Sequence, residues 1–341
     1  MFFKYERLDE RLEFLGDVDM TASLITFNQV LIMIIIIAIG ALCYKVKLID
    51  NSTNQKLSNI VLMLVNPMVI FVSYQRDYDN ELLEGLLLAL LLSIITHIVS
   101  ITISYLLIRK KRKIRIAEDG IVTKKYVDNK DVEVERMCTI YSNVGFMGIP
   151  LMNGIFGSVG VFYATASITI FNIFIWTHGV ILMSGQGEFD LKGMLKKLIS
   201  PTLIAIILGL LFFIFQIRIP GVLHEAFQHI ANMNTPLAML VAGVTIGQAD
   251  FKKLITNYRI YIIAFLKLLF IPILLLLVYR MFPIDETVLS TAVILAGAPT
   301  ASTTIMFAMK YKKNSLYAAE IFTVTTLLSA ITIPFIVMLL G

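Results

Sequence analysis

Two short strings of small and polar residues, each set within apolar surroundings, are the parts of this sequence best suited to bind a ligand. The first runs from Ser142 to Leu151 and reads SNVGFMGIPL, and the second runs from Ala296 to Thr304 and reads AGAPTASTT. Proline removes a backbone hydrogen bond and glycine permits unusual backbone angles, so each string should interrupt a helix. A helix that restarts after such a break presents free N–H groups and a positive dipole end, which favours an anionic group.

The residues expected to line this site belong to the two strings and to one neighbouring helix. They are Asn143, Gly148, Pro150, Pro299, Thr300, Ser302 and Thr303, together with Asn66, which precedes Pro67. A plainer interpretation is that the small residues only let helices pack closely. Two such strings at matching positions favour the binding site.

Ionisable residues inside apolar segments are a second source of chemistry. Lys267 lies nine residues into a segment that begins near residue 258, which is about 14 Å of helix. Its burial costs at least a few kcal/mol unless it is paired, so it could attract an anion, stand where a coupling cation would sit, or form a structural ion pair with Glu320. His97 and His178 could relay protons or could simply bond backbone carbonyls.

The elements that must position these residues are membrane helices. The 341 residues are 57% hydrophobic and 16% charged, against about 25% charged in soluble domains, which leaves no room for a separate catalytic domain. Apolar runs long enough to cross a bilayer predict an all-α membrane protein with ten spans. The spans are 24–44, 55–74, 83–108, 137–155, 161–183, 199–217, 234–249, 258–279, 288–309 and 316–340.

Ten spans divide into two sets of five, 24–183 and 184–341. An odd number of spans in each half requires the second half to be inverted in the membrane. Prolines mark matching positions, Pro67 with Pro236 and Pro150 with Pro299. Inverted repeats with interrupted helices near the bilayer midplane are typical of secondary transporters.

The distribution of charge predicts the orientation. The stretch 109–136 is expected to be a mobile cytoplasmic loop, and on that basis the connections on its side hold 22 Lys and Arg residues against six on the other side. The positive-inside rule then places both termini outside the cell membrane. Residues 1–23 are expected to be an N-terminal segment on the outer side, and their polar part, 1–19, is either dispensable or a surface helix.

The two strings, together with the stretches beginning at Pro236 and at Lys267, resemble the auxin efflux carrier family, which includes bacterial malate-permease-like proteins. The resemblance covers the chain from about residue 24. It implies a five-plus-five inverted repeat in which the fourth and ninth spans cross at their prolines. It also implies a scaffold of spans one, two, six and seven, and a transport bundle of the remaining spans that moves as an elevator. The short central loop favours a bacterial type of carrier.

We therefore expect a secondary transporter of a small organic anion such as a carboxylate, and not an enzyme. The alternative is a sodium-coupled organic-anion symporter of the bile-acid type. Hydrolase, zinc-protease and phosphate-loop motifs are missing from the sequence, and neither a cofactor nor a metal is expected. The expected partners are the anion and the lipid bilayer, with a homodimer allowed for and nucleic acid not expected.

Overall fold

The computed structural model describes residues 27–118, 121–185, 200–248, 254 and 257–340. The predicted segment 1–23 therefore lies outside the described residues, as do most of 184–199 and 249–256. The elements are the first helix Phe27–Lys45, α2 (Asn51–Ile60), η2 (Val61–Val65), α3 (Asn66–Ser73), α4 (Asn80–Leu107), β1 (Lys111–Glu118), β2 (Ile121–Asp128), α5 (Val132–Ile140), η3 (Val144–Gly148), α6 (Ile149–Phe174), η4 (Ile175–Gly179), α7 (Val180–Ser184), α9 (Pro201–Ile214), α10 (Gly221–Asn232), α11 (Asn234–Gly247), α13 (Tyr258–Phe265), η5 (Leu266–Phe270), α14 (Ile271–Tyr279), α15 (Glu286–Ala296), α16 (Thr303–Lys310) and α17 (Ser315–Leu340). The η elements are π-helical turns that continue the helices beside them.

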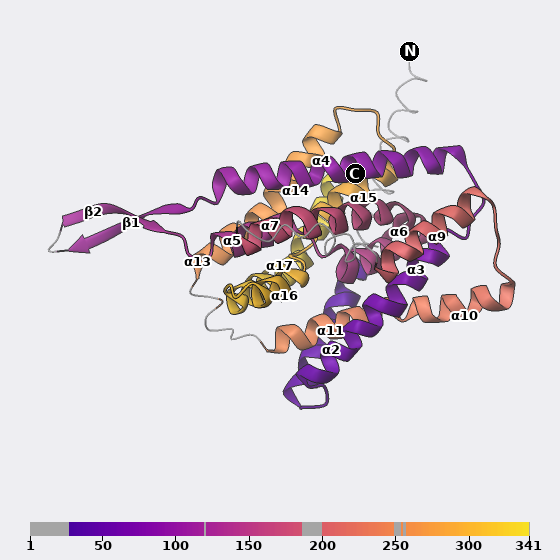
Figure 1. The fold of residues 1–341 in the computed structure, drawn as a ribbon, viewed down its shortest axis with the longest axis horizontal. Coiled ribbons are helices and arrows are strands. Elements are labelled where there is room, and N and C mark those ends of the chain that lie inside the picture. The colour runs from indigo at the N-terminus through magenta and orange to yellow at the C-terminus, as the bar shows by residue number, and fades with distance from the viewer. Residues whose placement is uncertain (1–26, 119–120, 186–199, 249–253, 255–256, 341) are drawn as a thin grey trace, which may run out of the picture.

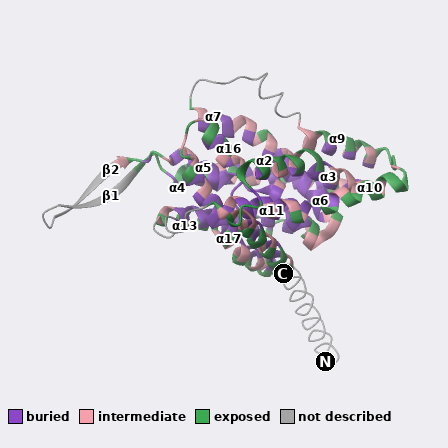
Figure 2. Cartoon of the chain, turned by 90° about the horizontal axis from the view of Figure 1, so that it is seen from below, coloured by how far each residue is buried: buried purple, intermediate pink, exposed green. Residues whose placement is uncertain are grey.

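Long apolar helices dominate the fold, which confirms the prediction of an all-α membrane protein. Seven described helical segments are long and apolar enough to cross a bilayer, and two shorter apolar helices, α9 and α15, accompany them. The short helix α15 lies in the interior, since every residue from Val288 to Ala296 is buried. Figure 2 shows this buried interior between helices whose outer faces are exposed.

Glycines set the closest contact between helices. A Cβ atom on Gly40 of the first helix would overlap the Leu240 carbonyl of α11, and one on Gly243 would overlap the Ile37 carbonyl. Only glycine fits at either position, so the first helix and α11 pack backbone against backbone.

The stretch 109–136 differs from the predicted mobile loop. Strands β1 and β2 pair as an antiparallel hairpin, with Lys111 opposite Asp128 and Glu118 opposite Ile121, and α5 begins at Val132. The hairpin extends from one end of the helical body, and α10 lies at the other end (Figure 1). The sequence carries one signal for it, the Asp119-Gly120 dipeptide, which is a common hairpin turn.

Two predicted boundaries also need correction. The seventh span does not begin at residue 234, because α10 and α11 form one apolar segment from Gly221 to Gly247. In Figure 1 the two helices follow one another in the same direction. The polar residues of α10 conceal this first half of the span from a hydropathy count.

The segment Val144–Ser184 is too long for a single span, since its 41 residues are more than one crossing needs. Gly157 interrupts it with φ 60° and ψ −148°, a conformation that suits glycine. A Cβ atom on Gly160 would lie 2.7 Å from the carbonyl oxygen of Met152, whereas residues eight apart in a straight helix are about 12 Å apart. The chain therefore turns back at Gly157, close to the predicted gap between 155 and 161.

Candidate functional site

The two predicted breaks meet each other. Ser142 forms an isolated antiparallel bridge with Thr300. The Asn143 N–H donates to the Pro299 carbonyl at 2.8 Å, and the Ala301 N–H donates to the Tyr141 carbonyl at 2.9 Å. Backbone groups that leave a helix inside a membrane need partners, and each break supplies them to the other.

Gly148 and Pro150 shape the helix that restarts after the first break. A Cβ atom on Gly148 would lie 2.7 Å from the Leu295 side chain of α15, so glycine permits the close approach of the two interrupted helices. Pro150 lies in the first turn of α6, where its missing N–H costs little. Both residues therefore build the site without offering a polar side chain to a ligand.

Asn143 offers the polar group that is most available to a ligand. Its side chain is 3% exposed, and its Oδ1 accepts a hydrogen bond from the Phe146 N–H at 3.4 Å. Its Nδ2 is buried and has no hydrogen-bond partner among the described residues. Buried amide N–H groups are nearly always satisfied, so this donor is a candidate ligand contact.

Asn66 joins this site from a helix outside the two breaks. Its Nδ2 donates to the Gly145 carbonyl at 3.4 Å, and its Oδ1 accepts from Asn234 Nδ2 at 2.6 Å. The two asparagines hold the matching positions of the predicted repeat. The Asn234 Oδ1 is buried and lacks a hydrogen-bond partner among the described residues.

The second string divides into two parts. Thr300 is fully buried, and its hydroxyl donates to the Cys138 carbonyl at 2.8 Å, so it holds the crossing together. Ser302 and Thr303 are half-buried at the start of α16, and the Thr303 hydroxyl has no partner among the described residues. The crossing thus brings together Asn143, Pro299 and Thr300.

Lys267 reaches the same crossing from η5. It is 1% exposed, and its Nζ donates to Ser142 Oγ at 2.5 Å and to the Ile140 carbonyl at 3.4 Å. The Ser142 hydroxyl in turn donates to the Ala296 carbonyl at 3.2 Å. Ile140 ends α5 and Ala296 ends α15, so the ammonium lies at the negative dipole ends of two half-helices.

The other predicted ionisable residues lie near this crossing or in the same bundle. Glu320 is buried on α17 at 9% exposure. His97 Nδ1 donates a hydrogen bond to the Ser93 carbonyl at 2.8 Å, which is the plainer of its two predicted roles. It also lines a cavity of about 20 Å³ with Ser93, Thr96 and Ser142, enough for about one water molecule.

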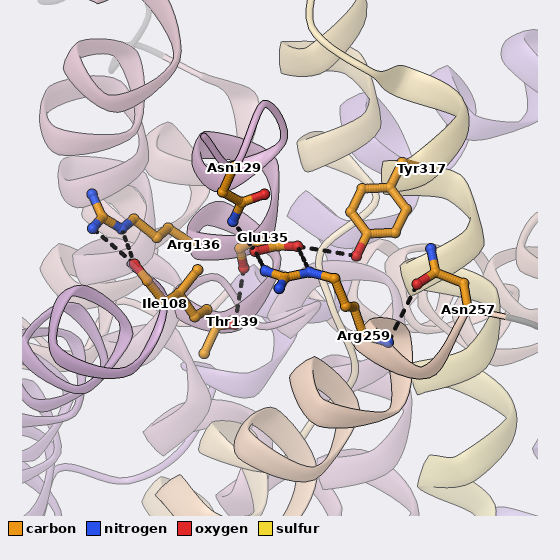
Figure 3. A network of polar contacts seen from close by, with 8 residues as sticks. All are labelled: Ile108, Asn129, Glu135, Arg136, Thr139, Asn257, Arg259 and Tyr317. Atoms are coloured by element: carbon orange, nitrogen blue, oxygen red, sulfur yellow. Dashed lines mark hydrogen bonds and ion pairs between the residues drawn. The ribbon is translucent and has the colours of Figure 1, made fainter. Parts of the chain in front are cut away.

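A buried ion pair near the hairpin end of the bundle was not predicted (Figure 3). Glu135 of α5 is 1% exposed and accepts from Arg259 Nε at 2.6 Å, from Arg259 Nη2, from Asn129 Nδ2 at 2.7 Å and from the Tyr317 hydroxyl at 3.2 Å. The pair joins α5, α13 and α17. The apolar residues Val132, Val134 and Met137 around Glu135 are the sequence signal that this part of 109–136 is a buried helix.

Among the described residues, no three His, Cys, Asp or Glu side chains gather as a metal site requires. The fold and site define a multi-pass, all-α membrane protein in which two interrupted helices meet at a polar, buried crossing.

Comparison with known proteins gives the family. The sequence matches the family described as Membrane transport protein over residues 25–337. The chain belongs to this family of transporters, and the resemblance to the auxin efflux carrier family is confirmed.

Its relatives bear the same general description. An uncharacterized transporter of Methanothermobacter thermautotrophicus is 22% identical over 311 residues, which cover 90% of this chain and 96% of the relative. The uncharacterized transporter YfdV of Escherichia coli K12 is 24% identical over 200 residues, covering 56% of this chain and 62% of the relative. The uncharacterized transporter MJ1031 of Methanocaldococcus jannaschii is 24% identical over 237 residues, covering 67% and 71%.

Proposed function

We propose that the protein is a secondary transporter that moves a small organic anion, most simply a carboxylate, by alternating access. The observation that carries this proposal is the unpartnered Asn143 Nδ2 at the start of a half-helix. A carboxylate accepts hydrogen bonds and does not donate them, and the positive end of the half-helix dipole favours its charge. Asn66, which contacts Gly145 in the next turn, completes the proposed binding site with the starts of η3 and α16.

The proposed architecture is a five-plus-five inverted repeat that works as an elevator. Two observations support it: the antiparallel pairing of the two breaks and the hydrogen bond between the matching Asn66 and Asn234. In this scheme the first helix, α2, α3 and α9 to α11 form the scaffold. The remaining helices carry the crossing past it.

Lys267 has a proposed charge role in this cycle. The carbonyls at the ends of α5 and α15 form the kind of site that binds a cation, and the Lys267 ammonium already contacts the Ile140 carbonyl and Ser142. A sodium ion at the same carbonyls would face a fixed positive charge. We therefore favour transport without sodium coupling over the bile-acid type of symport.

The proposed location is the cell membrane, with the hairpin end of the molecule inside and both termini outside. Lys110, Lys130 and Lys313 belong to connections at the hairpin end, whereas the opposite side carries fewer basic residues. A cysteine at position 119 or 120 should react with an impermeant reagent only after the cells are opened. Reaction in intact cells would show that the hairpin end lies outside and that the proposed orientation is wrong.

The test of function is uptake by purified protein in liposomes, screened with mono- and dicarboxylates that include malate and indole-3-acetate. We expect saturable uptake that responds to voltage or to a proton gradient, and that does not depend on sodium. Asn143→Ala should abolish it. Asn172→Ala is the matched control, because among the described residues the hydrogen bond of Asn172 Nδ2 goes to the Ile168 carbonyl of its own helix, at 2.8 Å. Non-saturating conductance would refute the carrier, and equal activity of both variants would place the binding site elsewhere.

A further inference from the structure

His97 of α4 is a buried ionisable residue that has no part in the proposed transport cycle. Its ring stacks on Phe174, with the two centroids 5.0 Å apart, and its Nδ1–H donates to the Ser93 carbonyl at 2.8 Å. The second ring nitrogen, Nε2, has no hydrogen-bond partner among the described residues. Its surroundings therefore decide what it can do.

The cavity of about 20 Å³ adjoins both His97 and the groups that hold Lys267. Part of its lining consists of groups that the Lys267 ammonium reaches directly or through one hydroxyl, from Ile140, Ser142 and Ala296. A second proton on His97 would place another buried positive charge beside Lys267, which is unfavourable. The ring is therefore neutral, and Nε2 is an acceptor.

The hydroxyl groups of α4 and α6 around this cavity use their protons elsewhere. A hydroxyl has a single proton to donate. Ser93 donates its proton to the Ala89 carbonyl at 2.7 Å. The Ser167 hydroxyl lies 2.8 Å from Ser93 Oγ, so Ser167 is the donor of that pair and presents only lone pairs to the cavity.

The two remaining hydroxyls of the lining follow the same rule. Tyr279 donates to the Leu92 carbonyl at 2.8 Å, so Thr96, 2.9 Å from the Tyr279 hydroxyl, donates to it. Ser142 donates to the Ala296 carbonyl at 3.2 Å. The polar side chains that line the cavity therefore offer it hydrogen-bond acceptors and no free donor.

A space lined by acceptors suits a molecule that brings its own donors, and Lys267 supplies one more. An ammonium has three N–H donors. Lys267 uses one on Ser142 Oγ at 2.5 Å and one on the Ile140 carbonyl at 3.4 Å, and the third has no partner among the described residues. A buried water typically makes about three hydrogen bonds. It can accept the third N–H here and donate to His97 Nε2 and to one hydroxyl oxygen of the lining.

We propose that this cavity binds one water molecule that joins Lys267 to His97, and that His97 is a positioning residue for the buried charge at the crossing. Through this water, α4 holds the ammonium together with the ends of α5 and α15. The effect on transport rests on the proposed charge role of Lys267, but the water and its two contacts can be tested without any transport.

Two substitutions of His97 separate the water contact from the contact with Ser93. His97→Asn keeps an N–H donor near the position of Nδ1 and removes the acceptor at Nε2, whereas His97→Gln places an amide oxygen near Nε2 and loses the Ser93 contact. We expect His97→Asn to slow carboxylate uptake in liposomes about tenfold, the effect of one hydrogen bond in a charged network, and His97→Gln to slow it less. His178→Asn is the matched control and should leave uptake unchanged, because the His178 Nδ1 contact is to the Tyr141 hydroxyl at 3.0 Å, away from the cavity lining.

The link to Lys267 is tested on thermal stability in detergent. His97→Asn should lower the Tm of the unchanged chain by a few degrees. It should have little effect in the Lys267→Met chain, where the water has already lost its donor. Equal decreases in both chains would overturn the link between the two residues. An experimental map that resolves ordered water should show one within about 3.2 Å of His97 Nε2, and an empty cavity would overturn the water site.

The uptake results separate this proposal from the proposed function. Uptake by His97→Asn at the unchanged rate, or uptake by His97→Gln no faster than by His97→Asn, would overturn the positioning role of His97. If the unchanged chain takes up no carboxylate, the proposed function is refuted. The stability measurements and the map then still decide whether the water joins Lys267 to His97.

Discussion

Neutralising Glu135 should destabilise the protein far more than neutralising an acid two residues away on the same helix. Glu135 is 1% exposed and accepts hydrogen bonds from Arg259, Asn129 and Tyr317. Removing one partner of a buried ion pair costs about 3–5 kcal/mol, because the other charge stays buried without compensation. The Arg259 side chain is 22% exposed, so some solvation remains and the lower end, about 3 kcal/mol, is expected for Glu135→Gln.

The matched control is Glu133→Gln. Glu133 and Lys313 lie 3.7 Å apart, and their side chains are 28% and 31% exposed. Partly exposed pairs contribute about 0–1 kcal/mol. Purified protein in detergent is heated, and the melting temperatures of the two variants are compared with that of the unchanged chain. Domains of 150–250 residues lose roughly 2–4 °C per kcal/mol and longer chains lose less, so Glu135→Gln should lower Tm by about 6 °C and Glu133→Gln by at most about 2 °C.

The pair should also be coupled. Arg259→Met in a Glu135→Leu background removes both charges and leaves none buried alone, so it should recover part of the lost stability. If the Glu135→Gln and Glu133→Gln variants have the same melting temperature, the structural role of the network is refuted. So would strictly additive losses in the double variant.

Three further predictions follow from the helix contacts and the crossing. Lys267→Met should abolish carboxylate uptake in liposomes, and normal uptake would exclude a charge role. It should change Tm by only a few degrees, because the loss of two hydrogen bonds is offset by no longer burying a charge. Gly243→Ala should destabilise by about 1–3 kcal/mol through overlap with the first helix, measured as Tm, whereas Gly221→Ala, with open space around it, should be neutral. Asn66→Ala and Asn234→Ala should show a coupling energy of about 1 kcal/mol in a double-mutant cycle of thermal stability, and additivity would mean that their hydrogen bond contributes nothing.

The sequence predicts most of this fold because apolar length alone identifies a membrane helix. It fails where charge and function compete with that signal. Helix α10 carries Glu225, Gln228, His229 and Asn232, and these polar residues led the predicted span to begin only at residue 234 although α10 continues into α11. Helix α5 contains Glu135 and Arg136 within nine residues, and the charges conceal a buried helix because sequence alone does not show that Arg259 pairs with Glu135.

The candidate site shows the same limit at the level of single side chains. Pro299 and Asn143 are recognisable as parts of two breaks, and the structure joins their backbones at 2.8 Å. The sequence does not show that the Thr300 hydroxyl donates a hydrogen bond to the Cys138 carbonyl, or that Lys267 donates one to Ser142. Those contacts join residues 162 and 125 positions apart, and they depend on packing that no local pattern encodes.

The position of Lys267 bears directly on how transport could be driven. Two half-helices end at Ile140 and Ala296, and each brings unpaired carbonyls and a negative dipole end into the membrane interior. A transporter can neutralise such ends with a bound cation, which must then enter and leave with each cycle, or with a charge that belongs to the chain. The Lys267 ammonium bonds the Ile140 carbonyl directly and reaches the Ala296 carbonyl through Ser142. In the proposed elevator cycle a tethered charge would stay with the crossing in both orientations, so the loaded and empty carriers would differ by the charge of the anion alone. Net transport of a monoanion would then move one negative charge per cycle, and its rate in liposomes should respond to membrane voltage even when sodium is absent from both sides.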